Sequence, residues 1–168
     1  PARTQPLYRL TFAAKGAVML PAAASLGTGD SARPLAGKVV CLDPGHIGGD
    51  WADIEERTFR IGRDQPVVEG ELNLKVCRIL EQRLKEAGAR VVWTHDGYEP
   101  TTPLRPADLY PEAISYLLQG SRGARLPRTS ANRLIRWNAE LLFYRSAEIQ
   151  ARARRVNEQL QPDLTLCL

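Results

Sequence analysis

The sequence predicts an α/β domain in which helices flank a mostly parallel sheet. Three short apolar runs, at residues 39–42, 91–94 and 164–168, alternate with two segments of helical periodicity, at residues 71–87 and 149–160. This alternation is typical of right-handed crossover connections between parallel strands. Because such sheets carry their sites beyond the carboxyl ends of the strands, we expect functional groups at the edge where the first and third strands end.

The chain divides into an N-terminal extension at residues 1–36 and a main domain at residues 37–168. Residues 7–12 alternate weakly between polar and apolar side chains, which favours a short hairpin with residues 17–20. After Pro21 the composition shifts to Ala, Ser, Gly, Asp and Pro, which is typical of a linker.

Composition excludes several broad classes of protein. The 168 residues are 43% hydrophobic and 25% charged, which is ordinary for one globular domain and argues against disorder. No uncharged apolar run of about 18 residues occurs, so no membrane-spanning helix is expected. The net charge of +4 is compatible with an anionic partner but does not identify one.

Three cysteines, Cys41, Cys77 and Cys167, fall in the first strand, the first helix and the third strand. Their apolar neighbours favour a role as small buried hydrophobic residues. The odd count and the lack of a Cys-x-x-Cys spacing argue against a disulfide framework or a metal-binding thiol pair.

The first strand, at residues 39–42, is apolar on both faces and ends in the turn Asp43-Pro44-Gly45, followed directly by His46. A rigid strand and a tight turn are a common way to position a functional side chain. Taken alone, His46 fits a metal ligand as well as a histidine that hydrogen-bonds the turn backbone.

The helix at residues 71–87 is preceded by Glu69, whose carboxylate has two interpretations. It either stabilises the positive end of the helix dipole or, together with His46, binds a zinc ion. Glu71 lies two residues later, and successive helix positions do not share a face, so only one of the two is expected to face a metal. The apolar positions expected to face the core are Leu72, Val76, Ile79, Leu80 and Leu84.

Two motifs in this order resemble a known family. The motif Asp43-Pro44-Gly45-His46-x-Gly48-Gly49, followed by Glu69-Gly70-Glu71-Leu72-Asn73-Leu74, is similar to the zinc-dependent N-acetylmuramoyl-L-alanine amidases of the amidase-3 type. The resemblance extends over residues 37–168, apart from one long insertion. It implies that His46 and Glu69 are zinc ligands. A second histidine would complete the zinc site after Asp163-Leu164-Thr165-Leu166-Cys167-Leu168, where the sequence stops, and a catalytic Glu would follow further on.

The resemblance implies a peptidoglycan hydrolase with an incomplete, zinc-amidase-like fold. Its substrate would be the amide bond between N-acetylmuramic acid and L-alanine, cleaved by zinc-activated water outside the bacterial cytoplasm, in the periplasm or after secretion. Zn²⁺ is the expected cofactor and peptidoglycan the expected partner, and no nucleic-acid partner is expected. Because the third ligand and the general base lie beyond residue 168, residues 1–168 alone are expected to bind zinc weakly and to be inactive.

Two other functions compete with this interpretation. A non-catalytic peptidoglycan-binding or regulatory domain derived from an amidase would share the same motifs. Gly45, Gly48 and Gly49 also suggest a phosphate-binding loop, but neither Gly-x-Gly-x-x-Gly nor a Gly-Lys-Ser/Thr ending is present, and no helix is expected directly after Gly49.

Three further side chains belong near the same edge. Asp43 is expected to hydrogen-bond the turn, in preference to orienting the imidazole of a zinc-bound histidine. His95 follows the second strand and is interpreted as a loop histidine in preference to a site residue. Arg152 matches an arginine of the family's last helix, and a structural role is favoured for it.

The insertion at residues 97–146 is rich in proline and arginine and is longer than an ordinary connection. It is expected to contain two short helices, at residues 112–118 and 132–144. A solvated helical cover is the favoured interpretation, and a basic lobe that binds anionic glycan or peptide carboxylates is the alternative.

Overall fold

A three-stranded parallel sheet lies at the centre of the computed structural model, which describes residues 32–120 and 128–168. Strand β1 (Val39–Asp43) is in the middle, with β4 (Arg90–Trp93) on one side and β5 (Leu164–Cys167) on the other. The predicted α/β class with a parallel sheet is confirmed. The N-terminal hairpin and most of the predicted linker lie outside the described residues.

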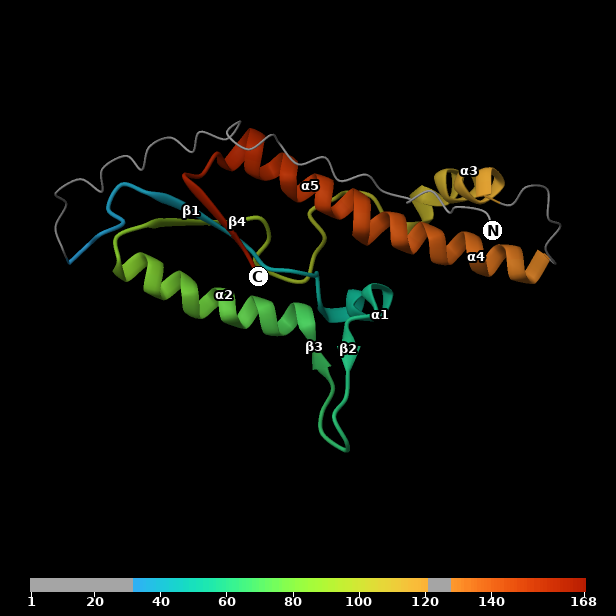
Figure 1. Ribbon diagram of the computed structural model, residues 1–168, viewed down its shortest axis with the longest axis horizontal. Helices are drawn as coiled ribbons and strands as arrows, with labels where there is room; N and C mark the ends of the chain where they lie inside the picture. The colour runs from blue at the N-terminus through green and yellow to red at the C-terminus, as the bar shows by residue number, and fades with distance from the viewer. Residues whose placement is uncertain (1–31, 121–127) are drawn as a thin grey trace, which may run out of the picture.

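The middle strand, β1, is buried because it pairs with a strand along each edge and is covered by a helix on each face (Figure 1). Val40, Cys41 and Leu42 are almost completely inaccessible to solvent. In register, Val40 lies opposite Val91 of β4 and Leu164 of β5. A parallel strand covered on both faces is apolar on both faces, as residues 39–42 of β1 are.

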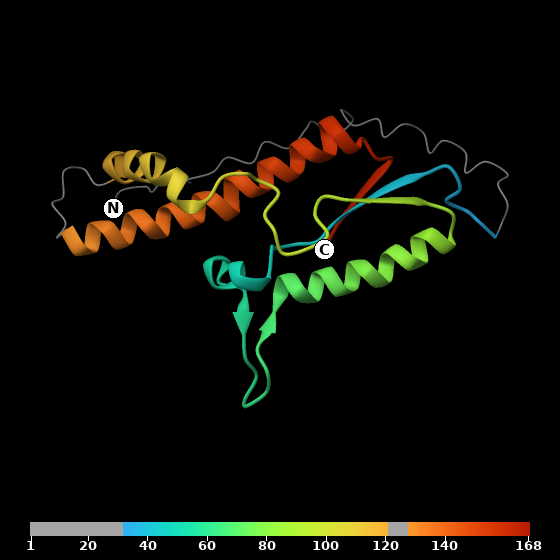
Figure 2. The same cartoon turned by 180° about the vertical axis from the view of Figure 1, so that it is seen from behind.

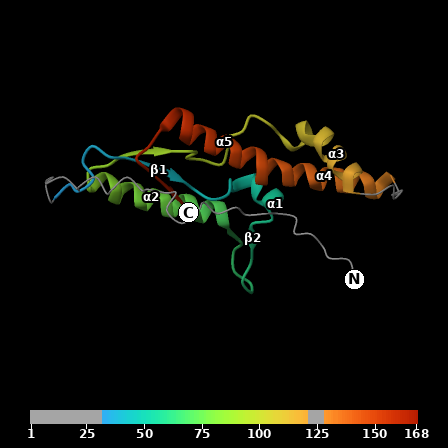
Figure 3. The ribbon, with the colours of Figure 1, turned by 45° about the horizontal axis from the view of Figure 1, so that its top comes forward.

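Helices cover the two faces of the sheet. Helix α2 (Glu69–Glu86) packs against β1 and β4 on one face, and a long C-terminal helix lies over the other face (Figures 1 and 2). Figure 3 shows the same order of layers from a third direction. The C-terminus lies at the carboxyl edge of the sheet, next to the turn that follows β1.

The predicted core face of α2 was right only in part. Leu80 and Leu84 are half-buried, but Leu72, Val76 and Ile79 are exposed, and the buried residues of this helix are Gly70 and Cys77. A β-carbon at position 70 would come within 2.6 Å of the backbone nitrogen of Gly48, so the small residues set how closely α2 approaches the β1 loop. The face of α2 that is buried is therefore the one where its backbone approaches the β1 loop at Gly70. The spacing of apolar residues does not reveal this contact.

The long C-terminal helix contains four consecutive segments without a break. They are α4 (Arg128–Leu142), η3 (Phe143–Ala147), α5 (Glu148–Arg154) and η4 (Arg155–Leu160), of which η3 and η4 are π-helical. The sequence predicted two separate helices, at residues 132–144 and 149–160, with the insertion ending at residue 146. A π-helical turn shifts the apolar positions out of α-helical phase, which explains the apparent break.

A shorter helix, α3 (Tyr110–Gly120), packs against α4 at the end of the long helix that lies away from the sheet (Figure 1). Helix α3 follows the single-turn helix η2 (Pro106–Leu109) and includes the predicted helix at residues 112–118. Among the described residues, no helix is long and apolar enough to cross a membrane.

The sequence did not predict the structure between β1 and α2. Helices η1 (Gly49–Trp51) and α1 (Ala52–Glu55) follow the turn, and strands β2 (Thr58–Phe59) and β3 (Val67–Val68) form an antiparallel hairpin that projects from the body (Figure 1). Ile47 packs with Phe143 and Tyr144 of the long helix, and the Trp51 ring lies 5.1 Å from that of Phe143. This small core holds the loop after β1 against the helix.

Two of the three cysteines are buried, as the sequence predicted, and the third is not. Burial raises the pKa of Cys41 and of Cys77 to about 11, so neither thiol is reactive at neutral pH. Cys167 is exposed, because β5 lies at the edge of the sheet and no described strand covers it.

Candidate metal centre

The turn after β1 is locked to the end of β5. The amide of Gly45 donates to the carbonyl of Leu168 at 2.7 Å, and the amide of Leu168 donates to the carbonyl of Asp43 at 3.2 Å. A β-carbon on Gly45 would collide with the Leu168 carbonyl, which requires glycine in the turn. The ends of the first and third strands therefore meet at one edge, as the topology predicted.

His46 has a left-handed backbone conformation, with φ of 63°, which is uncommon for a residue other than glycine. Such a conformation persists only where surrounding contacts hold it. One of these contacts is visible at its own carbonyl, which accepts a hydrogen bond from Nη2 of Arg152 at 3.1 Å. The backbone of His46 is therefore held by a contact with the long helix.

The imidazole of His46 lies between two carboxylates. Its Nδ1 is 3.5 Å from Oε1 of Glu55, and its Nε2 is 3.5 Å from Oε1 of Glu69. The side chain of Glu55 is only 4% exposed, whereas those of His46 and Glu69 are 24% and 42% exposed. The structure thus brings the two predicted ligands, His46 and Glu69, together on the more open side of the ring.

The spacing of these two donors fits a shared zinc ion. Zinc takes imidazole nitrogen and carboxylate oxygen at about 2.0–2.2 Å in tetrahedral geometry, which places two ligand atoms about 3.4 Å apart. The separation of 3.5 Å between Nε2 of His46 and Oε1 of Glu69 is close to that value. Within residues 32–120 and 128–168, however, no group of three or more His, Cys, Asp or Glu side chains is arranged to hold a metal.

Glu69 is placed by the hairpin that precedes α2. It is the first residue of the helix, and its amide donates to the carbonyl of Arg57 at 3.0 Å. The guanidinium Nε of Arg57 lies 3.8 Å from Oε2 of Glu69. Of the two glutamates in the first turn, the structure therefore places Glu69 beside His46, and no contact joins Glu71 to that ring within the described part of the chain.

The carboxylate beside Nδ1 of His46 is Glu55, a residue that the sequence analysis did not consider. Glu55 follows His46 by nine positions, in a segment where no helix was expected. In the sequence Glu55 is one of two adjacent glutamates, Glu55 and Glu56, and nothing there indicates that Glu55 is buried while Glu56 is exposed. The carboxylate of Asp43 was expected to hydrogen-bond the turn in preference to orienting the ring. It instead accepts a hydrogen bond from Oγ1 of Thr94 at 2.6 Å and lies 3.4 Å from Nη1 of Arg152.

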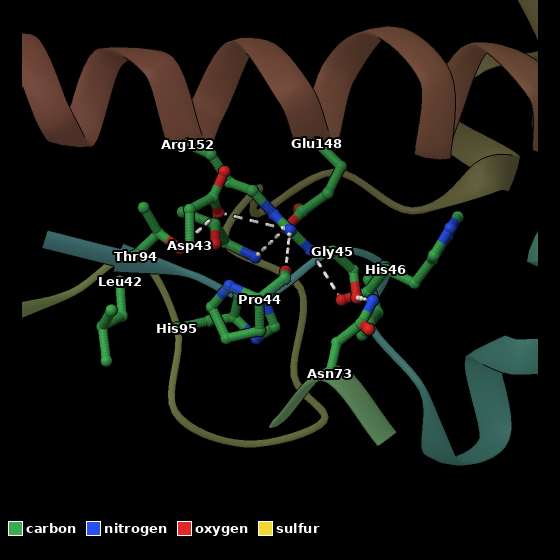
Figure 4. Close-up of polar contacts among 12 residues, drawn as sticks. Leu42, Asp43, Pro44, Gly45, His46, Asn73, Thr94, His95, Glu148 and Arg152 are labelled. Carbon is green, nitrogen blue, oxygen red and sulfur yellow. Dashed lines mark hydrogen bonds and ion pairs between the residues drawn. The ribbon is translucent and has the colours of Figure 1, made fainter. Parts of the chain in front are cut away.

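Arg152 fastens the long helix to the turn. Its Nε donates to Oε1 of Glu148 at 2.7 Å, and its Nη1 donates to the carbonyl of Pro44 at 2.6 Å and lies 3.4 Å from Oδ1 of Asp43 (Figure 4). The side chains of Glu148 and Arg152 are both almost fully buried. These contacts give Arg152 the structural position that the sequence favoured for it.

Glu148 also anchors the loop after β4. Its two carboxylate oxygens accept the amides of Thr101 and Thr102 at 3.0 and 2.9 Å. Burial alone would raise the pKa of Glu148, but the hydrogen bonds from Thr102, Arg152 and Thr101 outweigh it and hold the pKa below its usual value. The site is therefore supported by a buried charge pair that has hydrogen-bond partners.

His95 lies beneath the same turn. Its Nε2 is 2.9 Å from the carbonyl of Pro44 and its Nδ1 is 3.0 Å from the carbonyl of Gly97. Both ring nitrogens contact backbone oxygens, so neither is directed at the pair formed by His46 and Glu69. This arrangement is that of a loop histidine.

A cleft of about 590 Å³ opens beside His46. Its lining includes His46, Glu55 and Arg57 on the side of the β1 loop, and Arg145, Ile149 and Val156 on the side of the long helix. Arg145 is exposed, its Nε donates to the hydroxyl of Tyr144 at 3.0 Å, and its guanidinium lies over that ring. The cleft therefore combines an apolar wall with two exposed arginines, Arg57 and Arg145, and the buried Arg152.

Comparison with protein-family models, with curated proteins and with solved structures found no match.

Proposed function

We propose that this protein is a zinc-dependent amidase that cleaves the bond between N-acetylmuramic acid and L-alanine in peptidoglycan, outside the bacterial cytoplasm. One observation carries the proposal. The two residues that the sequence motifs indicate as zinc ligands, His46 and Glu69, come from different elements, and their Nε2 and Oε1 atoms lie 3.5 Å apart.

His46 and Glu69 would hold the metal through Nε2 and Oε1. Bound zinc supplies Lewis acidity and lowers the pKa of a coordinated water toward neutrality. In a protein that continues past Leu168, the next residues would emerge beside Gly45, which already hydrogen-bonds the Leu168 carbonyl. The motif places the second histidine there, so all three ligands would belong to one edge of the sheet.

The cleft has the polarity that a peptidoglycan stem peptide requires. Ile149 and Val156 offer apolar contact for the lactyl and alanyl methyl groups, and Arg57 and Arg145 offer positive charge for the carboxylates of the peptide. Among the described residues Arg145 has no carboxylate partner, so its guanidinium is available for a substrate.

One observation supports a second candidate function, peptidoglycan binding without hydrolysis. Among the described residues, His46 and Glu69 lie together and no third side chain completes a group that could hold a metal. A domain with this pair alone would retain the cleft and its arginines while holding zinc too weakly for catalysis.

The experiment that tests the proposal measures two quantities on the protein produced by its own gene: bound zinc per chain, and peptide released from purified peptidoglycan. We expect one zinc per chain and release of stem peptides with a free L-alanine amino terminus. Both are expected to be lost in His46→Ala and retained in the control Glu71→Gln, which removes a neighbouring charge that does not contact His46. Sedimentation with peptidoglycan but no zinc and no release would contradict the amidase and favour the binding function.

A further inference from the structure

We propose that Glu55 is a positioning residue that fixes the tautomer of the His46 imidazole, with the proton on Nδ1 and the free lone pair on Nε2. This inference deepens the proposed function, because a histidine binds zinc through an unprotonated nitrogen. It names the residue that keeps Nε2 available on the side where Glu69 lies.

The first observation is the place of the Glu55 carboxylate. It lies at the end of α1, is 4% exposed, and has Oε1 3.5 Å from Nδ1 of His46. A carboxylate can only accept hydrogen bonds, and a neutral imidazole carries one N–H. The tautomer with that N–H on Nδ1 is therefore the one that Glu55 stabilises.

The second observation is that Glu55 is itself held in place. Its carboxylate accepts the amide of Ile47 at 3.0 and 2.9 Å through its two oxygens, and the amide of Gly48 at 3.2 Å. These amides belong to the two residues that follow His46 in the chain. The same carboxylate thus holds the loop that carries the ring and faces the ring itself, so the two cannot move independently.

The two carboxylates beside the ring differ in how strongly they attract the imidazole N–H. Glu69 lies equally close to Nε2, but it is 42% exposed and is shared with Arg57, so solvent and the guanidinium weaken its pull on a proton. Glu55 is buried, where an electrostatic contact is stronger. The buried carboxylate therefore determines which nitrogen carries the proton.

The tautomer can be measured directly on metal-free protein. Nitrogen-15 chemical shifts of the imidazole, recorded at alkaline pH, distinguish a ring protonated on Nδ1 from one protonated on Nε2. The chain has two histidines, so the signals of only one other imidazole, that of His95, have to be told apart from those of His46. We expect His46 to be protonated on Nδ1 in the native protein, and a ring protonated on Nε2 would overturn the inference.

The variant Glu55→Gln keeps the size of the side chain and removes the charge. We expect the proton to redistribute toward Nε2 and the affinity for Zn²⁺ to fall by about 10–100-fold. The control Asp53→Asn changes an exposed carboxylate on the same helix and is expected to alter neither quantity. An unchanged Nδ1 tautomer in Glu55→Gln would overturn the role of Glu55.

If Glu55→Gln does not fold, Glu55→Asp takes its place. This variant keeps a carboxylate but moves it away from the ring by the length of one methylene group. We expect a mixture of the two tautomers. A ring wholly protonated on Nδ1 would contradict the inference. Because the tautomer is read without metal or substrate, its outcome is separate from that of the amidase proposal. A protein with the Nδ1 tautomer that fails to bind zinc would refute only the proposed function.

Discussion

Single side chains at this site connect parts of the molecule that are distant in sequence. Arg152 joins the long helix to the carbonyls of Pro44 and His46, more than one hundred positions earlier in the chain. Glu55 joins α1 to the amides after His46. The loop that carries the imidazole therefore depends on Arg152 of the long helix and Glu55 of α1, and neither residue belongs to the motif around His46.

The buried pair of Glu148 and Arg152 gives the first prediction. Glu148→Gln removes the closer of the two carboxylates beside Arg152 and leaves Asp43 at 3.4 Å, and breaking a buried ion pair costs about 3–5 kcal/mol. Urea denaturation at pH 7 should show this loss in the free energy of unfolding. The control Glu140→Gln breaks a surface pair with Arg136 and should cost less than about 1 kcal/mol. Equal effects of the two variants would contradict the structural role of the buried pair.

The same pair makes stability depend on pH. The pKa of Glu148 is lower in the folded protein than the unfolded value of about 4.3, so its contribution is fully present above that value. It is lost as the pH falls through the folded pKa. Below about pH 4.3 the native protein should therefore lose stability more steeply than Glu148→Gln, as measured by urea denaturation at several pH values. Parallel pH profiles would show that Glu148 is not the group responsible.

Arg145 provides a prediction about the substrate. Arg145→Gln removes from the cleft a guanidinium that has no carboxylate partner among the described residues. A hydrogen bond between charged groups contributes about 1.5–3 kcal/mol, so affinity for soluble peptidoglycan fragments should fall roughly tenfold or more. The matched control is Arg136→Gln, whose side chain is paired with Glu140. Equal affinities of the native protein and Arg145→Gln, measured by calorimetry, would exclude a role of Arg145 in binding.

At the scale of elements, the strands were easier to predict from sequence than the faces of the helices. Residues 39–42, 91–94 and 164–168 were expected as strands, and β1, β4 and β5 lie within one residue of those bounds. Apolar runs fix buried parallel strands because both faces must be covered. The buried face of α2 could not be predicted in this way, because it depends on the approach of Gly70 to Gly48, which is a tertiary contact.

That approach can be tested by substitution. Alanine in place of glycine within a helix normally stabilises a protein by about 0.4–1 kcal/mol. At Gly70 the added methyl would come within 2.6 Å of the Gly48 nitrogen, so we expect a loss of about 1–3 kcal/mol in urea denaturation. Gly97→Ala is the control, because a β-carbon there meets nothing within 4 Å. A Gly70→Ala protein as stable as the native one would show that α2 does not pack this closely.

For the whole molecule, the alternation of strands and helices predicted that His46 and the end of the third strand would lie at one edge of the sheet. The sequence motifs, and not the alternation, predicted Glu69 beside His46, and the structure places the two together. Glu55 could not be foreseen, because its burial follows from helix α1, whose short segment has no clear periodicity. The zinc role of the pair remains a prediction.

The layered arrangement makes a prediction about thiol reactivity. Cys41 of β1 and Cys77 of α2 are buried, and Cys167 is exposed on the edge strand β5. A thiol reagent should therefore modify one of the three cysteines in the native protein and all three after unfolding. The reaction of Cys167 should be slow at neutral pH, because burial of part of the side chain and the nearby Asp43 raise its pKa. Rapid modification of three thiols under native conditions would contradict the packing described.

The measurement that tests the central claim most directly is the location of zinc by its anomalous X-ray scattering in crystals of the protein grown with Zn²⁺. We expect a peak about 2.0–2.2 Å from both Nε2 of His46 and Oε1 of Glu69. A peak bound to other side chains, or the absence of a peak between these two atoms at saturating zinc, would contradict it.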